Sequence, residues 1–147
     1  MLSHILGNNE AVLGLNELHF IGRRWSTSSP ETWSRDRAVR EAAALVAIAR
    51  RSIWNNEPTA VEVDEAESLF PPGKQQSFAP AAIYEAVLTY LAAEEDAACV
   101  VDQTPRNIVD AQFLLEHFPE ARVVHLVRDP RAVLWSQRNR WRQRWIG

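Results

Sequence analysis

The residues best placed to bind a ligand lie at a predicted turn from a strand to a helix near the C-terminal end of the sequence. The run 123–127 has the nearly continuous apolar character of a strand buried in a parallel sheet. Arg128 follows it, and Asp129 and Pro130 then fit the N-cap and first position of a helix that also carries Arg131. Anionic ligands bind at such turns in open α/β sheets. The turn predicts an anion site, although an ordinary strand and helix with a surface arginine would look the same.

A carboxylate occupies a comparable position earlier in the chain. Glu17 follows the short apolar run 11–15, which predicts a second strand. If the strands are parallel, Glu17 lies at the same edge of the sheet as Arg128. An acid is also favourable at the start of a helix, because the helix dipole is positive there. The shared edge favours a functional role over this purely structural one.

Several elements must hold these residues in place. The run 123–127 is preceded by three predicted elements: a strand at 98–102, a polar turn at 103–107 and a helix at 108–118. This βαβα order predicts an α/β fold with a parallel sheet and a right-handed crossover. Cys99, in the first of these strands, is predicted to be a buried core thiol. The remaining predicted helices are 1–6, 35–54, 79–94 and the one beginning at Pro130.

Length and charge restrict the remaining possibilities. The 147 residues suit a single domain, 1–147, with a surface insertion rich in proline and acids at about 55–78. Neither a signal peptide nor a membrane span is visible, which favours a cytoplasmic location. Residues 122–147 carry a net charge of +6 and the first 121 residues a net charge of −9. The basic end is therefore the end predicted to face an anion.

The sequence of residues 125–137, His-Leu-Val-Arg-Asp-Pro-Arg-Ala-Val-Leu-Trp-Ser-Gln, resembles a segment of the sulfotransferases that use 3′-phosphoadenosine 5′-phosphosulfate (PAPS). In that family this segment binds the 3′-phosphate, and the resemblance implies that Arg128 and Ser136 do so here. The segment Leu-Asn-Glu-Leu, residues 15–18, is similar to one whose glutamate is the general base toward the acceptor hydroxyl, which implies this role for Glu17. His19 is either a second base near the substrate or a packed core imidazole.

The turn 102–107, Asp-Gln-Thr-Pro-Arg-Asn, resembles a turn common in these enzymes. Gln103 stands where a lysine is frequent, and its neutral amide can orient an acceptor but cannot neutralise developing sulfate charge. Arg106 could take over part of that role near the substrate, or it could be an ordinary surface arginine beside a helix.

The resemblance implies a three-layer parallel sheet similar to the P-loop-type sulfotransferase fold, with the first strand and the phosphate loop missing before Met1. The implied reaction is transfer of a sulfuryl group from PAPS to a hydroxyl or amine of a small molecule, glycan or protein, without a metal ion. The resemblance implies a domain that is incomplete at its N-terminus and at its C-terminus. We therefore expect these residues alone to have little or no activity.

Two other classes of protein remain open from the sequence. A nucleotide kinase relative would share the fold, but it should show a Gly-x-x-x-x-Gly-Lys-Ser/Thr loop, and the sequence contains none. A non-catalytic protein could use the alternating arginines and tryptophans of residues 138–145 to bind nucleic acid or another polyanion. A helix whose tryptophans pack while its arginines line an anionic cleft explains that alternation more economically, so no nucleic-acid partner is expected.

Overall fold

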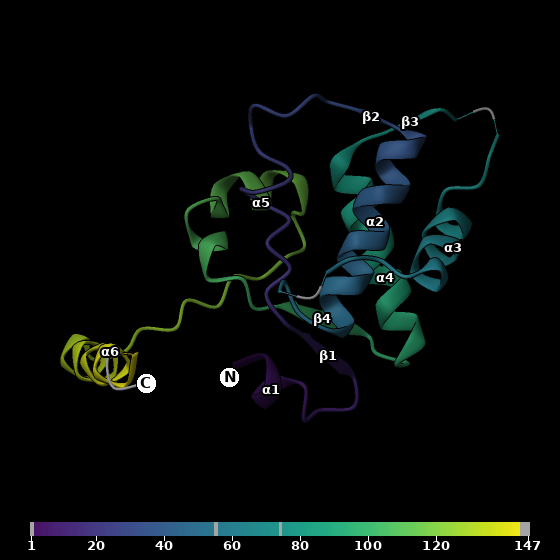
Figure 1. Cartoon of the computed structure of the whole chain (residues 1–147). Helices are drawn as coiled ribbons and strands as arrows, with labels where there is room; N and C mark the ends of the chain where they lie inside the picture. Colours follow the sequence, from purple (N-terminus) through teal and green to yellow (C-terminus); the bar gives the residue numbers. More distant parts are fainter. Residues whose placement is uncertain (1, 55, 74, 145–147) are drawn as a thin grey trace.

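The computed structural model describes residues 2–54, 56–73 and 75–144 and has an α/β fold (Figure 1). The predicted helices at 1–6, 35–54, 79–94 and from Pro130, and the strands at 11–15 and 98–102, are confirmed with small shifts of their ends. In chain order the elements are α1 (Leu2–Leu6), β1 (Val12–Leu15), β2 (Trp33–Ser34), α2 (Arg35–Arg50), α3 (Ala60–Leu69), β3 (Ser77–Phe78), α4 (Pro80–Glu94), β4 (Cys99–Asp102), the 3₁₀ helix η1 (Pro105–Ile108), α5 (Ala111–His117) and α6 (Pro130–Arg144).

The parallel sheet consists of β1 and β4. The two strands are parallel, and their register runs from Val12 opposite Cys99 to Leu15 opposite Asp102. Parallel strands end at the same edge of a sheet. The residues that follow Leu15 and Asp102 are therefore brought together, whereas the sequence predicted that Glu17 would share its edge with Arg128.

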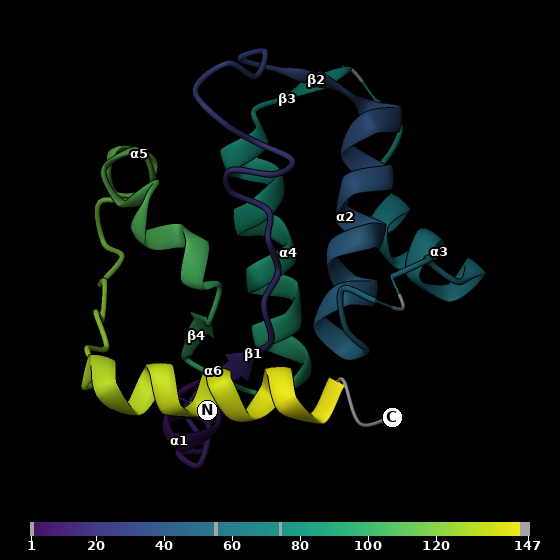
Figure 2. The ribbon, with the colours of Figure 1, turned by 60° about the vertical axis from the view of Figure 1, so that its left-hand side comes forward.

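Helices cover both faces of this small sheet. α1 lies on one face, and α2 and α4 lie on the other (Figures 1 and 2). The approach of α1 is so close that a Cβ at Gly14 would lie 2.2 Å from the carbonyl oxygen of Ser3. Only glycine leaves room for that contact, so Gly14 fixes how tightly α1 packs on β1.

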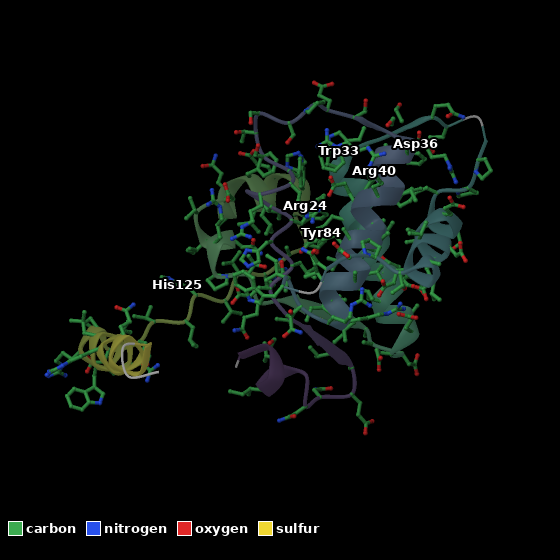
Figure 3. The ribbon with its side chains drawn as sticks, in the orientation of Figure 1. Arg24, Trp33, Asp36, Arg40, Tyr84 and His125 are labelled. Atoms are coloured by element: carbon green, nitrogen blue, oxygen red, sulfur yellow. The ribbon has the colours of Figure 1, made fainter. Side chains whose placement is uncertain are left out.

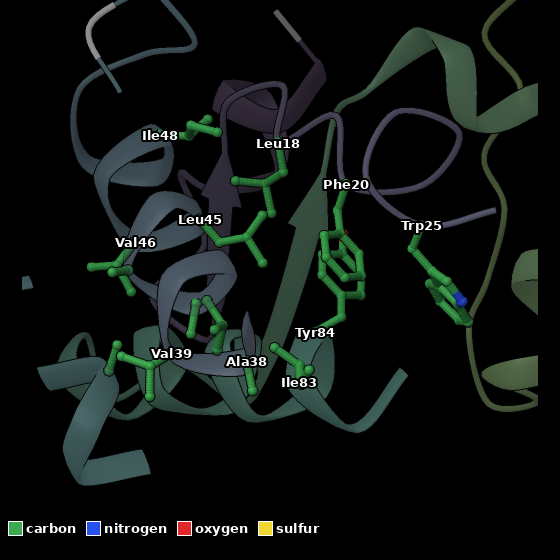
Figure 4. Close-up of a cluster of buried hydrophobic side chains, with 14 of the residues drawn as sticks. Leu18, Phe20, Trp25, Ala38, Val39, Leu45, Val46, Ile48, Ile83 and Tyr84 are labelled. Atoms are coloured by element: carbon green, nitrogen blue, oxygen red, sulfur yellow. The ribbon is translucent and has the colours of Figure 1, made fainter. Parts of the chain in front are cut away.

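The hydrophobic core lies between α2, α4 and the segment that follows β1. α2 turns Ala38, Ala42 and Leu45 toward the core, and α4 contributes Ile83. Figure 4 shows Ala38, Leu45 and Ile83 converging with Leu18, Phe20 and Tyr84. The rings of Phe20 and Tyr84 are stacked, with centroids 4.9 Å apart. The core therefore anchors the chain just after β1, which is where Glu17 lies.

The stretch 55–78, predicted to be a surface insertion, contains α3 and β3. α3 is attached to the end of α2 by Glu62, which is buried and receives hydrogen bonds of 2.6 and 2.9 Å from the guanidinium of Arg51. Its carboxylate also accepts the backbone N–H of Thr59 in a capping box. The Arg51 hydrogen bonds, followed by those of Thr59, lower the pKa of Glu62 to about 2.

Replacing Glu62 with glutamine should lower the free energy of unfolding by about 2 kcal/mol at pH 7, the typical value of hydrogen bonds to a charged group. Because the pKa of Glu62 is lower in the folded state than its ordinary value of 4.5, this stabilisation is fully present above that value. It is lost as the pH falls from about 4.5 to about 2. Urea unfolding of both proteins at pH 7 and pH 3 measures the loss. The control is Glu67→Gln, because Glu67 is exposed on the same helix. If the two changes lowered the free energy of unfolding equally, the hydrogen bonds between Arg51 and Glu62 would not stabilise the fold.

The strand predicted at 123–127 is not formed. Residues 121–129 are irregular chain that leads to α6, which stands apart from the sheet (Figure 1). The exposed fractions of Val124, Leu126 and Val127 are 64, 61 and 80%. An apolar run shows that a segment can be buried, but a strand also needs a hydrogen-bonded neighbour. Consequently the described residues form neither the three-layer sheet nor the predicted crossover from 98–102 to 123–127.

Two further expectations concern exposure. Cys99 is exposed, so the prediction of a buried core thiol is wrong. Cys99 is the first residue of β4, and the three residues that follow it in the strand are partly buried. Among residues 2–54, 56–73 and 75–144, no helix has the length and apolar character required to cross a membrane.

Candidate active site at the carboxyl edge of the sheet

A carboxylate and an imidazole meet just after β1. Oε2 of Glu17 lies 2.9 Å from Nε2 of His19, and their side chains are 48 and 14% exposed. Glu17 thus reaches solvent. His19 is largely buried, and its ring contacts the carboxylate of Glu17 and restricts its position. A solvent-accessible carboxylate within hydrogen-bond distance of a fixed imidazole can accept a proton from a bound hydroxyl.

The backbone of His19 adopts an unusual conformation. Its φ is 53°, in the left-handed region that residues other than glycine seldom occupy. The backbone N–H of His19 donates a 3.2 Å hydrogen bond to Oγ1 of Thr104, which helps to hold this conformation. Nδ1 of the ring is buried and has no hydrogen-bond partner among the described residues. Strained residues of this kind concentrate at functional sites, so the conformation supports a role for this turn.

Asp102, the last residue of β4, connects the two strand ends. Its Oδ1 accepts hydrogen bonds from Thr104 Oγ1 at 2.7 Å and from the Leu18 backbone N–H at 3.4 Å. Its Oδ2 accepts from Tyr84 Oη at 2.8 Å and from Asn107 Nδ2 at 3.0 Å. Burial, followed by the charge of Asp102 and this hydrogen bond, raises the pKa of Tyr84 well above its ordinary value. Asp102 therefore holds the backbone immediately after Glu17 against the end of β4.

Gln103 and Arg106 follow Asp102 in the same turn. The side-chain oxygen of Gln103 accepts hydrogen bonds of 2.8 Å from both the backbone N–H and the hydroxyl of Ser3. It therefore ties the turn to α1. Arg106 is 55% exposed at its side chain, and its Nε lies 3.9 Å from Asp110 Oδ2. Arg106 lies beside the loop that follows Glu17, because a Cβ at Gly22 would come within 2.7 Å of its Nε.

Arg128 and Ser136 lie elsewhere in this structure. Both are exposed, Arg128 on the irregular segment before α6 and Ser136 within α6. Figure 3 shows His125, three residues before Arg128, on the stretch that leads away from the sheet. The predicted helix start is present, since Oδ1 of Asp129 accepts the backbone N–H of Arg131 at 2.9 Å. The side chains beyond Arg138, including the alternation 138–145, lie outside the described residues.

The structure thus brings Glu17 and His19 together with the turn that carries Gln103, and it does not bring Arg128 to them. Sequence reasoning placed Asp102 at a strand end but did not identify it as the residue that organises the site. A signal was present, because Asp102 and Thr104 form an Asp-x-Thr turn, and short polar side chains there hydrogen-bond nearby backbone. Tyr84 could not have been found from the sequence, since it comes from a helix 18 residues earlier.

One cavity among the described residues lies away from this edge. It measures about 460 Å³ and is lined by residues at the amino end of β1, among them Asn9, Glu10 and Val12, and by Glu95. None of the predicted site residues lines it. Within the described residues, no group of three or more histidine, cysteine, aspartate or glutamate side chains could hold a metal ion.

The fold and the position of Glu17 define an α/β protein with a parallel sheet whose carboxyl edge carries polar, proton-accepting side chains. A protein-family model described as the sulfotransferase family matches residues 1–145. The chain therefore belongs to the sulfotransferase family. No curated protein and no solved structure matches it.

Proposed function

We propose that this protein transfers a sulfuryl group from PAPS to a hydroxyl or amine acceptor, with Glu17 as general base. Membership of the sulfotransferase family supports the reaction type. The geometry of Glu17 is the main support for its assignment as the base. Its side chain is half exposed at the carboxyl edge of the sheet, and its Oε2 lies 2.9 Å from Nε2 of His19.

The proposed reaction assigns the proton to Glu17. As the acceptor oxygen or nitrogen forms its bond to sulfur, the bond between sulfur and the 5′-phosphate oxygen breaks, and Glu17 takes the acceptor's proton. The protein contributes mainly by positioning the reactants and stabilising spread negative charge, as in phosphoryl transfer. His19 keeps the carboxylate in place, while Asp102 and Thr104 hold the backbone that carries both residues.

Arg128 and Ser136 are proposed to bind the 3′-phosphate of the nucleotide. Their donor groups suit a phosphate, because a guanidinium can give two parallel hydrogen bonds and a hydroxyl a third. Arg128 is exposed and has no hydrogen bond or ion pair with the residues that the structure describes. Covering the exposed valines and leucine of 123–127 would be favourable, at about 1.5–3 kcal/mol for each large side chain. We propose that this segment docks against the sheet when nucleotide is bound, with Arg128 at the edge that carries Glu17.

Arg128→Lys should weaken binding of 3′-phosphoadenosine 5′-phosphate by roughly tenfold or more. Lysine keeps the charge but loses the paired hydrogen bonds, each worth about 1.5–3 kcal/mol to a charged group. Binding of adenosine 5′-phosphate, which lacks the 3′-phosphate, should change little. Ser136→Ala should act in the same direction but more weakly.

Calorimetric titration of the full-length protein with both nucleotides, at one fixed salt concentration, measures these differences. Arg122→Lys is the matched control, because Arg122 is exposed on the same segment and donates only to the backbone carbonyls of Glu120 and Ala121 among the described residues. Equal losses for the two nucleotides would mean that Arg128 does not bind the 3′-phosphate.

One observation favours a second candidate function, polyanion binding without catalysis. Trp135 is 65% exposed on α6, and the neighbouring Arg138 is also exposed. Binding of this kind would follow the charge of the ligand backbone. Its affinity would fall steeply with salt, and the protein would show no preference for a nucleotide with a 3′-phosphate.

A further inference from the structure

A second, smaller cavity adjoins the Glu17–His19 pair. It measures about 250 Å³, and its apolar lining consists of Leu18, Ile48 and Ile53. His19 lines the same cavity, and its Nε2 lies 2.9 Å from the Glu17 carboxylate. One imidazole thus separates the cavity from the proposed base.

The apolar floor of this cavity is part of the core. Leu18 is fully buried and Ile48 is 1% exposed, and Figure 4 shows them beside Leu45 between α2 and the segment after β1. Well-packed core side chains keep their positions, so the floor is formed before any ligand binds. Ile53, just after α2, is only partly buried and packs against this core from the side.

The polar residues at the rim of this cavity include one positive charge that no described residue neutralises. Arg24 also lines the cavity, but its guanidinium lies 2.6 Å from the carboxylate of Glu41, which offsets its charge. Arg23 is exposed and makes no hydrogen bond or ion pair with the residues that the structure describes. Asn56 completes the rim with an amide that can donate or accept. The rim therefore favours an anionic group.

We propose that this cavity binds the acceptor, and that the acceptor is a compact molecule with one ring or short branched alkyl unit, a hydroxyl group and a carboxylate. The apolar unit packs on Leu18, Ile48 and Ile53, the carboxylate faces Arg23, and the hydroxyl points past His19 to Glu17. This inference rests on the proposed role of Glu17. The volume sets the size, because pockets for drug-sized ligands measure about 300–1,000 Å³.

Binding of 4-hydroxybenzoate and of phenol to the full-length protein tests the proposal without nucleotide or turnover. In ¹H–¹⁵N spectra, both probes should shift signals of residues 18–24 and 48–56, with 4-hydroxybenzoate binding more tightly. Arg23→Gln should weaken 4-hydroxybenzoate roughly tenfold, the equivalent of one charged hydrogen bond, and leave phenol unchanged. Arg40→Gln is the control, because Arg40 is an exposed residue of α2 (Figure 3). At 1.5 Å per residue it lies about 12 Å before Ile48 along the helix axis.

A second variant tests the cavity itself. Ile53→Trp should fill it and abolish the shifts from both probes, while circular dichroism shows that the variant is folded. Shifts elsewhere in the spectrum, or equal weakening by Arg23→Gln and Arg40→Gln, would overturn the proposal, and so would unchanged binding to a folded Ile53→Trp. Arg23→Gln alters only an exposed side chain, so the test stands even if Ile53→Trp does not fold. Because neither probe requires Glu17 or PAPS, a failure here is distinct from an absence of sulfuryl transfer.

Discussion

Glu17→Gln in the full-length protein should lower kcat for sulfuryl transfer by about 10²–10⁴-fold, the usual contribution of a positioned general base. Glutamine keeps the size and shape of glutamate and can still contact His19, but it cannot take the acceptor proton. The affinity for 3′-phosphoadenosine 5′-phosphate should barely change, because the side chain is proposed to face the acceptor.

The matched control for this change is Glu10→Gln. Glu10 is exposed just before β1, at the opposite end of the strand from Glu17, and its replacement should leave kcat unchanged. Thermal unfolding of both variants separates catalysis from stability. If Glu17→Gln lowered only the unfolding temperature, Glu17 would have a structural role at the end of the strand and the proposed mechanism would fail.

Asp102→Ala should lower the free energy of unfolding by about 3–4 kcal/mol. Its carboxylate receives hydrogen bonds from Tyr84, Asn107, Thr104 and the backbone of Leu18. Alanine leaves these donors without an acceptor, and each unsatisfied buried group costs about 1–3 kcal/mol. Part of that cost is recovered where water can enter, since Asp102 is only partly buried.

Urea unfolding followed by tryptophan fluorescence measures this effect. Asp64→Ala, an exposed change on α3, should alter the free energy by no more than about 0.5 kcal/mol. Tyr84→Phe should cost about 2 kcal/mol, because it removes one hydrogen bond to the charged carboxylate of Asp102. If Asp102→Ala were as mild as Asp64→Ala, Asp102 would not organise the site.

Local patterns were sufficient to predict most helices and both strands of the sheet. α2 follows the helical spacing of Ala38, Ala42 and Leu45, and Pro130 begins α6 at the predicted position. The parallel direction of the sheet was predicted, although the pairing of β1 with β4 was not. In these places one short segment contains the information that specifies its structure.

Long-range contacts could not be predicted in the same way. The run 123–127 has the composition of a strand, but pairing depends on a neighbour that its own residues do not specify. Cys99 has apolar neighbours in sequence and is nevertheless exposed, because the cover of a strand comes from other elements. The Tyr84–Asp102 hydrogen bond and the left-handed backbone of His19 arise only when α4, β1 and β4 come together.

The most direct test of the account is transfer of ³⁵S-labelled sulfuryl groups from PAPS to 4-hydroxybenzoate and to a panel of other hydroxyl and amine acceptors by the full-length protein. We expect label on at least one acceptor with the wild-type protein and with Glu10→Gln. With Glu17→Gln we expect the label to accumulate at least 100-fold more slowly. Transfer at equal rates by wild type and Glu17→Gln, or no transfer to any acceptor by a folded protein that binds the nucleotide, would contradict it.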